Sequence, residues 1–93
     1  MKVRSIALIV CEEFGLAPEK IFSRDRWRYL SARPRQVVCW LTRKTTNRSY
    51  TQIARVFGLD GSGARKGQQR LKRYMAADPA LKAKVERCMA RIA

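Results

Sequence analysis

The sequence predicts an all-α protein, a compact helical domain of about five helices with a central helix-turn-helix that spans residues 1–93. Three observations lead to this fold class. Apolar residues recur at three- and four-residue steps through most of the chain, and no alternating strand pattern competes with them. Capping residues, glycines and prolines punctuate these segments. A chain of 93 residues with 46% apolar content has the size of one domain and enough apolar residues for a core.

The first predicted helix runs from Val3 to Phe14, with apolar side chains at helical steps along one face. Gly15 is the expected stop, because glycine accepts the left-handed conformation that often follows a helix. Pro18 suits the first residue of a short helical turn, since that position needs no N–H partner. The N-terminal part is therefore predicted as one long helix and one short turn of helix.

Residues 23–29 break the helical pattern and are predicted to form an extended or irregular connector. Its two aromatic residues, Trp27 and Tyr29, have two open interpretations, burial in the core or a place on the binding surface. For the alternating arginines we favour contact with DNA over a solvated loop: Arg24, Arg26 and Arg28.

A second long helix is predicted to begin near Pro34, because proline is favoured in the first turn of a helix. Its apolar stripe is formed by Val37, Trp40 and Leu41. The residues at the flanks of that stripe are Val38 and Cys39. Residues 45–47 are β-branched residues and asparagine, which are weak helix formers, and they end the helix.

Residues 49–73 have the pattern of a helix-turn-helix, a short capped helix followed by a glycine turn and a longer basic helix. Ser49 and Gln52 fit a capping box, in which each side chain bonds the backbone N–H of the other residue. Gly58 is expected to close the short helix in a left-handed conformation. The N-cap of the longer helix is predicted to be Asp60 or Ser62.

The longer helix of this motif has an inward side and a basic side. The inward side is predicted to carry Ala64, Gly67, Leu71, Tyr74 and Met75. In a helix-turn-helix the second helix enters the major groove of DNA, where Arg, Lys and Gln read base edges. A purely structural helix pair is the alternative, and the charge of the second helix argues against it. The basic side holds Arg65, Lys66, Gln69, Arg70, Lys72 and Arg73.

A final amphipathic helix is predicted to start at Asp78 and Pro79, a capping residue followed by a first-turn proline. Packing in the core is favoured for its apolar face, and docking of a partner protein is the alternative. That face consists of Leu81, Val85, Cys88, Met89 and Ile92.

The charge points to a polyanionic partner. Twenty-one Lys and Arg residues face seven Asp and Glu, which gives a formal net charge of +14. Residues 23–73 alone hold fourteen basic residues and two acids, a net +12, and the excess is therefore concentrated. Arginine is the commoner cation there, which suits bidentate contacts to phosphates and guanine. Nucleic acid is the predicted partner, and no membrane partner is expected because the basic residues lie in a punctuated domain.

Several other function classes have little support. The chain has no histidine and no Cys-x-x-Cys pair, so no metal site is expected. It has no paired carboxylates and no cysteine beside a base, so it is not predicted to be an enzyme. Residues 61–67 are glycine-rich but lack the Gly-Lys-Ser/Thr ending of a phosphate loop, and no cofactor or small-molecule ligand is expected. The odd number of cysteines indicates small core residues in a reducing compartment: Cys11, Cys39 and Cys88.

The apolar cluster in residues 1–10 is too short for a membrane span and lacks a signal-peptide cleavage site. We therefore expect a cytoplasmic protein associated with the nucleoid.

A set of residues between positions 32 and 58 lines up without a gap with a known family, and these residues are Ala32-Arg33-Pro34-Arg35-Gln36, Thr46-Asn47-Arg48-Ser49, Ile53 and Phe57-Gly58. In these residues the chain resembles the C-terminal DNA-binding domain of the bacterial replication initiator DnaA. The flanking helices also fit, so the resemblance covers nearly the whole chain. It implies an all-helical domain related in shape to the Trp repressor.

The resemblance also implies roles for individual residues. A basic stretch ahead of the Ala-Arg-Pro-Arg-Gln run places an arginine in the minor groove, which is Arg26 here, with Arg28 as the alternative. Arg35 and Gln36 correspond to positions near the DNA backbone at the start of a helix, where N–H groups favour phosphate. Ser49 corresponds to the residue that starts the bracing helix.

The chain departs from the family where the recognition helix begins. The family signature there is Asp-His-Thr-Thr, whereas this chain has Asp60-Gly61-Ser62-Gly63 if one residue is deleted after Gly58. The aspartate and one hydroxyl are kept, but two base-reading side chains are replaced by glycine. The sequence therefore predicts a base preference different from that of the family, because specificity can change on an inherited fold.

Double-stranded DNA binding is the predicted function, as a transcription regulator or as an accessory factor at a replication origin. A protein-interaction module that recruits or competes with a DNA-bound regulatory protein is the alternative, and RNA binding is a third hypothesis that the helix-turn-helix disfavours. The residues expected at the DNA interface are Arg24, Arg26, Arg28, Arg35, Gln36, Arg48, Ser49, Asp60, Gly61, Ser62, Gly63, Arg65, Lys66, Gln69 and Arg70.

Overall fold

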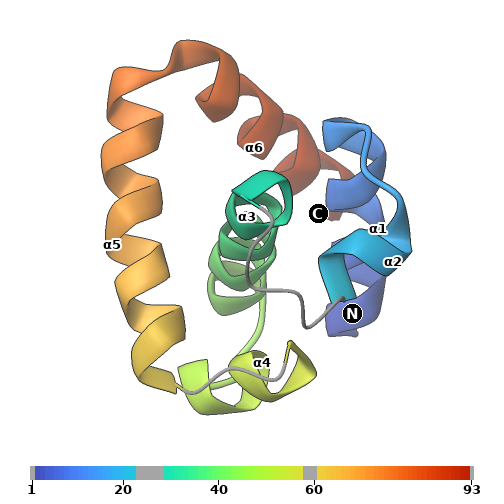
Figure 1. The fold of residues 1–93 in the computed structure, drawn as a ribbon, viewed down its shortest axis with the longest axis vertical. Coiled ribbons are helices and arrows are strands. Elements are labelled where there is room, and N and C mark those ends of the chain that lie inside the picture. Colours follow the sequence, from blue (N-terminus) through green and yellow to red (C-terminus); the bar gives the residue numbers. More distant parts are fainter. Residues whose placement is uncertain (1, 23–28, 58–60, 93) are drawn as a thin grey trace.

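A computed structural model describes residues 2–22, 29–57 and 61–92, with residues 29–32 and 61–62 described by their backbone only (Figure 1). All regular elements in this part of the chain are α-helices, as the sequence predicts. The short second helix corresponds to the predicted helical turn, and the other five correspond to the five predicted helices. They are α1 (Val3–Phe14), α2 (Pro18–Phe22), α3 (Tyr29–Thr45), α4 (Tyr50–Val56), α5 (Gly61–Ala77) and α6 (Pro79–Ile92).

Helix α3 is the centre of the fold. It contacts each of the other five helices, which surround it in Figure 1. The predicted stripe was too narrow, because a helix that packs against several neighbours buries more than one face. The two supposed flank residues, Val38 and Cys39, are as deeply buried as Val37 and Leu41, whereas Trp40 is only half-buried.

The predicted start of α3 near Pro34 is wrong. The helix begins at Tyr29, so Tyr29 belongs to α3 and not to the connector, and Pro34 lies in the second turn. A proline at this point lacks one N–H bond to the preceding turn, but its fixed φ is helical. Pro34 is also buried, and packing of its ring offsets part of that cost. Trp27 and the remaining connector lie outside the described residues.

Three predicted caps are confirmed. Gly15 has a φ of 63° and follows α1 in the left-handed region. The Ser49 hydroxyl accepts from the Gln52 N–H at 3.2 Å, and the Gln52 side-chain oxygen accepts from the Ser49 N–H at 2.9 Å. The Asp78 carboxylate accepts from the N–H groups of the second and third residues of α6 at 3.1 and 3.2 Å. Each cap satisfies backbone groups that a helix end leaves unpaired.

Two other cap predictions have different outcomes. Helix α4 ends at Val56 with Phe57 as its C-cap, and the left-handed conformation expected at Gly58 lies outside the described residues. Helix α5 begins at Gly61, so Ser62 lies within the helix and is not its N-cap. Asp60 precedes the helix but is not among the described residues.

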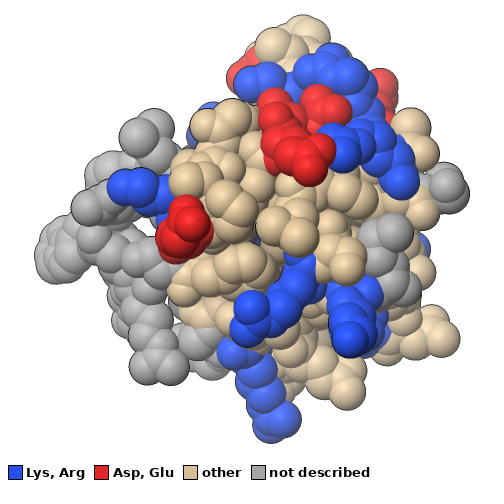
Figure 2. Space-filling view, turned by 90° about the vertical axis from the view of Figure 1, so that its right-hand side faces the viewer, with Lys and Arg blue, Asp and Glu red and all other residues tan. Residues whose placement is uncertain are grey.

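The acids of the described residues lie outside α3, α4 and α5. They are Glu12 and Glu13 on α1, Glu19 on α2, Asp78 between α5 and α6, and Glu86 on α6. Figure 2 shows the face over α1 and α2, where acidic side chains at one end lie among basic ones beside a broad uncharged area.

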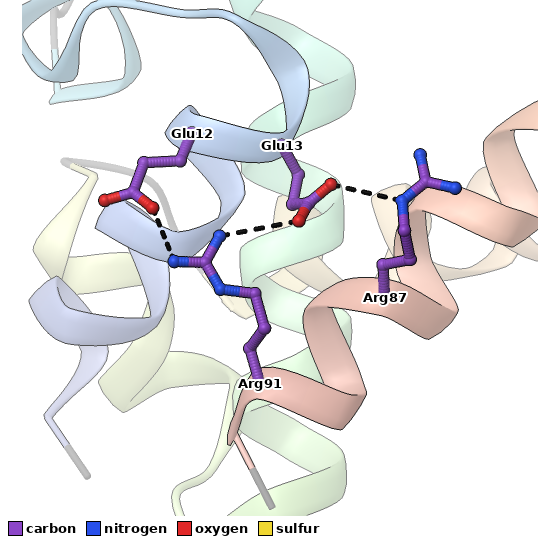
Figure 3. Close-up of polar contacts among 4 residues, drawn as sticks. All are labelled: Glu12, Glu13, Arg87 and Arg91. Carbon is purple, nitrogen blue, oxygen red and sulfur yellow. Dashed lines mark hydrogen bonds and ion pairs between the residues drawn. The ribbon is translucent and has the colours of Figure 1, made fainter.

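An ion-pair cluster joins α1 to α6 (Figure 3). Glu13 accepts from Arg87 Nε at 3.2 Å and from Arg91 Nη1 at 3.5 Å, and Arg91 also pairs with Glu12. The hydrogen bond to Glu12 is the main cause that raises the pKa of Arg91. Glu13 is the most buried member, because its side chain is only 20% exposed and two arginines share it.

Replacing Glu13 by glutamine should lower the free energy of unfolding by about 1 kcal/mol at low salt, because exposed ion-pair networks contribute little more than this. The loss should nearly vanish in 1 M salt, where screening acts over about 3 Å. Urea unfolding at both salt concentrations measures it. Glu86→Gln is the matched control, since Glu86 has the same charge, is exposed on α6 and forms no ion pair with any other described residue. Equal losses in both variants would show that net charge alone is responsible.

The three cysteines are free and buried, as predicted. Burial raises the pKa of the Cys39 thiol to about 12 and is the main cause that raises that of Cys88 to about 11. These thiols are neutral core residues that fill space between helices. In the described ranges no group of histidine, cysteine or acidic residues has the arrangement of a metal site. None of the described helices is long and apolar enough to cross a bilayer.

Candidate nucleic-acid interface

Helices α4 and α5 pack against one another as the two helices of the predicted helix-turn-helix. The capping box fixes the start of α4, whose residues Ile53 and Ala54 are buried. On α5, Ala64 and Leu71 face the core, and the side chains of Arg65 and Lys66 are exposed. The motif thus buries one side of each helix and leaves the basic side of α5 in solvent.

Close contact between α5 and the central helix α3 depends on a glycine and a glutamine. A Cβ atom at Gly67 would lie 3.2 Å from Gln36 Cγ, so a larger residue there would require the Gln36 side chain to shift. Next to it, Gln68 Nε2 donates to the Gln36 carbonyl at 3.1 Å. Gly67 therefore packs closely against α3, and a cross-helix hydrogen bond accompanies this contact.

Gln68 was assigned to neither side of α5 in the sequence analysis, so its burial was missed. It is 6% exposed, one of two polar residues in the described core. Its spacing was a usable signal, since Ala64, Gln68 and Leu71 recur at steps of four and three residues. Tyr74, by contrast, was predicted to face inward but is 41% exposed, and its ring lies 4.1 Å from the Arg33 guanidinium.

Several predicted interface residues form one exposed surface at the start of α4 and along α5. Ser49 is exposed at the N-cap of α4, and Arg48 beside it is half-buried. On α5 the exposed residues are Gly63, Arg65, Lys66, Gln69 and Arg70. Among the described residues no acid lies on α3, α4 or α5, so the described part of this surface is positively charged. The backbone of Gly61 and Ser62 forms the first turn of α5, from which this surface extends.

Arg35 and Gln36 have partners within the fold. Arg35 Nε donates to the Ile21 carbonyl at 2.8 Å, and its Nη2 reaches the Lys20 carbonyl at 3.4 Å. Arg35 thereby holds the C-terminal end of α2. Gln36 is half-buried beneath Gly67, and its side-chain oxygen is buried without a hydrogen-bond partner in the structure.

The resemblance places Arg35 and Gln36 near the DNA backbone, and their expected place at the start of a helix was an added reason for phosphate contact. That added reason is wrong, because α3 begins at Tyr29 and the two residues are the seventh and eighth of the helix. Their N–H groups are not among the unpaired donors of a helix N-terminus. Three further arginines of the predicted interface lie outside the described residues, and so does Asp60. These arginines are Arg24, Arg26 and Arg28.

A groove of about 300 Å³ between α3, α4 and α5 was not predicted from the sequence. Its aromatic residues are Trp40 and Tyr50, and we call it the aromatic groove. Lys44 and Lys72 lie 4.7 and 5.9 Å from the Trp40 ring. The guanidinium groups of Arg43 and Arg65 lie 5.1 and 5.7 Å from the Tyr50 ring. Trp40 was assigned to the core by its spacing, and for that reason the groove was missed.

The chain matches a known protein family. The family described as the bacterial dnaA protein helix-turn-helix matches residues 3–70, which extend from α1 through α4 into the middle of α5. No curated protein matches the chain.

Proposed function

Because the chain belongs to the bacterial DnaA helix-turn-helix family, a family of DNA-binding domains, we propose that residues 1–93 form one unit that binds double-stranded DNA with sequence preference. It works at the nucleoid as a transcription regulator or as an accessory factor at a replication origin. The family is non-catalytic, and the proposed activity is binding alone.

The observation that carries this proposal is the exposed basic side of α5 next to the capped start of α4. An α-helix fits the major groove of B-form DNA, and arginine, lysine and glutamine side chains there can bond base edges. The first half of α5 exposes Arg65, Lys66 and Gln69. Ser49 lies at the N-terminus of α4, where backbone N–H groups favour a phosphate. We assign base contacts to α5 and phosphate contacts to α4.

Arg26 is proposed to enter the minor groove, with Arg28 as the alternative. Support comes from the anchoring of the helix that precedes these residues. Arg35 bonds two carbonyls at the end of α2, and residues 23–28 follow α2 directly. We propose that Arg35 is a positioning residue, which fixes where the basic segment leaves the fold, in addition to the backbone contact first expected of it.

The glycines at positions 61 and 63 support a base preference that differs from the rest of the family. A glycine has no side chain to read a base, so recognition shifts to residues further along α5. Selection of bound sequences from a random duplex library would measure this preference. The length of the selected motif would also distinguish one site from two symmetric half-sites.

The affinity for duplex DNA should fall steeply with salt, with a slope of about −5 to −9 in a plot of log affinity against log salt concentration. This slope corresponds to roughly six to ten phosphate contacts, each of which releases counterions. Fluorescence anisotropy of a labelled duplex between 50 and 300 mM salt measures it. Absence of binding to any duplex at low salt would contradict the proposed function.

Docking of a partner through the apolar face of the last helix is not supported. Leu81, Val85 and Cys88 of α6 are buried against the rest of the protein, as favoured from the sequence. A second regulatory protein would have to contact another surface.

A further inference from the structure

The aromatic groove combines cations with aromatic rings, and double-stranded DNA does not offer a surface that contacts both. Its described walls carry four cations and two aromatic rings, and no acid is among the described residues that line it. A stacked base pair presents its edges and its phosphates, whereas the faces of its bases are covered by neighbouring pairs. Exposed rings next to cations are instead the combination that binds unpaired nucleotides, because bases stack on the rings while phosphates meet the cations.

Among the described residues the cations of the groove contact aromatic rings, and Arg43 also donates to the Arg48 carbonyl at 3.0 Å. None of the ion pairs found in residues 2–22, 29–57 and 61–92 involves Arg43, Lys44, Arg65 or Lys72. Cation–π contacts place two of them at each ring, at distances of 4.7 to 5.9 Å. Four like charges around one groove repel one another, and an anion between them would relieve that repulsion.

Both rings are accessible and come from different helices. Trp40 lies on α3 and Tyr50 at the first position of α4, and each is half-buried, so part of each ring remains in solvent. The groove volume of about 300 Å³ is at the lower end of the range for sites that hold small organic groups. Such a volume suits one or two nucleotides and is too small for a duplex.

We propose that the aromatic groove binds unpaired nucleotides of single-stranded DNA, with bases stacked on Trp40 and Tyr50 and phosphates paired with the surrounding Lys and Arg side chains. The proposal rests on the proposed function in taking DNA as the ligand, and it adds a second binding mode beside duplex recognition. Arg65 borders the groove and is also assigned to the duplex, so the two binding modes share this cation.

The test uses the full chain and a labelled twelve-residue thymidine strand, with a labelled duplex measured in parallel. Trp40→Leu combined with Tyr50→Leu should lower the affinity for the single strand about tenfold or more, because stacking contributes about 1–3 kcal/mol per base. The affinity for the duplex should stay within about twofold. Tyr74→Leu is the matched control, since Tyr74 is an exposed, cation-contacting tyrosine that does not line the groove. It should leave both affinities unchanged.

A fluorescence measurement tests the proposal without removing either ring of the groove. In a Trp27→Phe background Trp40 is the remaining tryptophan, and the thymidine strand should quench its emission while the duplex should not. Trp40→Phe, which keeps an aromatic face, should restore most of the single-strand affinity lost in Trp40→Leu.

Three outcomes would overturn the inference. The first is no binding of the thymidine strand at low salt, and the second is an unchanged single-strand affinity in the double variant. The third is an equal loss of single-strand and duplex affinity in the double variant when its unfolding temperature is that of the wild type. Failure of the duplex alone to bind would instead refute the proposed function and leave stacking in the groove intact.

Discussion

Replacing Arg65 and Lys66 together by alanine should lower the affinity for duplex DNA about a hundredfold. Each side chain is exposed on the first half of α5, where we place the major groove. A well-formed contact to a base is worth about 1–3 kcal/mol, and two contacts therefore account for a loss of this size. Stability should hardly change, because both side chains are in solvent and alanine favours the helix. Anisotropy titrations of one duplex at fixed salt measure the change.

The matched control is Lys82→Ala with Lys84→Ala on α6, which removes the same charge from a helix that lies outside the family match. This variant should lose at most a few-fold in affinity, through the smaller net charge. Equal losses in the two double variants would mean that general charge binds the DNA and that α5 is not the recognition helix.

Leu71→Ala should lower the free energy of unfolding by about 3 kcal/mol. Leu71 is fully buried on α5, and removing a buried leucine side chain costs the transfer free energy of its atoms and leaves a cavity. That amount is a large fraction of the stability of a small domain. Urea unfolding followed by circular dichroism measures the loss.

Leu8→Ala on α1 is the control for Leu71→Ala, because Leu8 is 46% exposed and the chemical change is the same. It should cost well under 1 kcal/mol. An equally small effect of Leu71→Ala would show that α5 is not packed on the core in solution. The weak attachment would then also reduce DNA affinity, since the recognition helix would lose its fixed orientation.

Elements with strong local signals could be predicted from the sequence. The capping box of Ser49 and Gln52, the stop at Gly15 and the start at Asp78 are short-range patterns with one physical solution each. The order and type of the helices followed from apolar spacing. The basic surface on α5 followed too, because charged side chains at those positions cannot be buried without partners.

Features that depend on distant parts of the chain could not be predicted in the same way. Burial of Val38 and Cys39 results from five helices packing around α3, which a single-helix pattern does not contain. Pro34 was predicted as a helix start because proline is favoured in the first turn. Its place in the second turn depends on packing with other helices, which the local sequence does not show. Arg35 was assigned to DNA by family resemblance, whereas its contacts to α2 depend on residues fourteen and fifteen positions away. The aromatic groove joins three helices, and no local pattern indicates it.

The uneven placement of charge has a kinetic consequence. Among the described residues the acids lie on or beside α1, α2 and α6, and the opposite part of the molecule has none, so the protein carries a permanent electric asymmetry. A molecule of this kind turns as it diffuses toward a polyanion, and such steering raises association rates by about ten- to a thousandfold at low ionic strength. The chain would reach a nucleic acid already in the productive orientation and would need few unproductive collisions before capture.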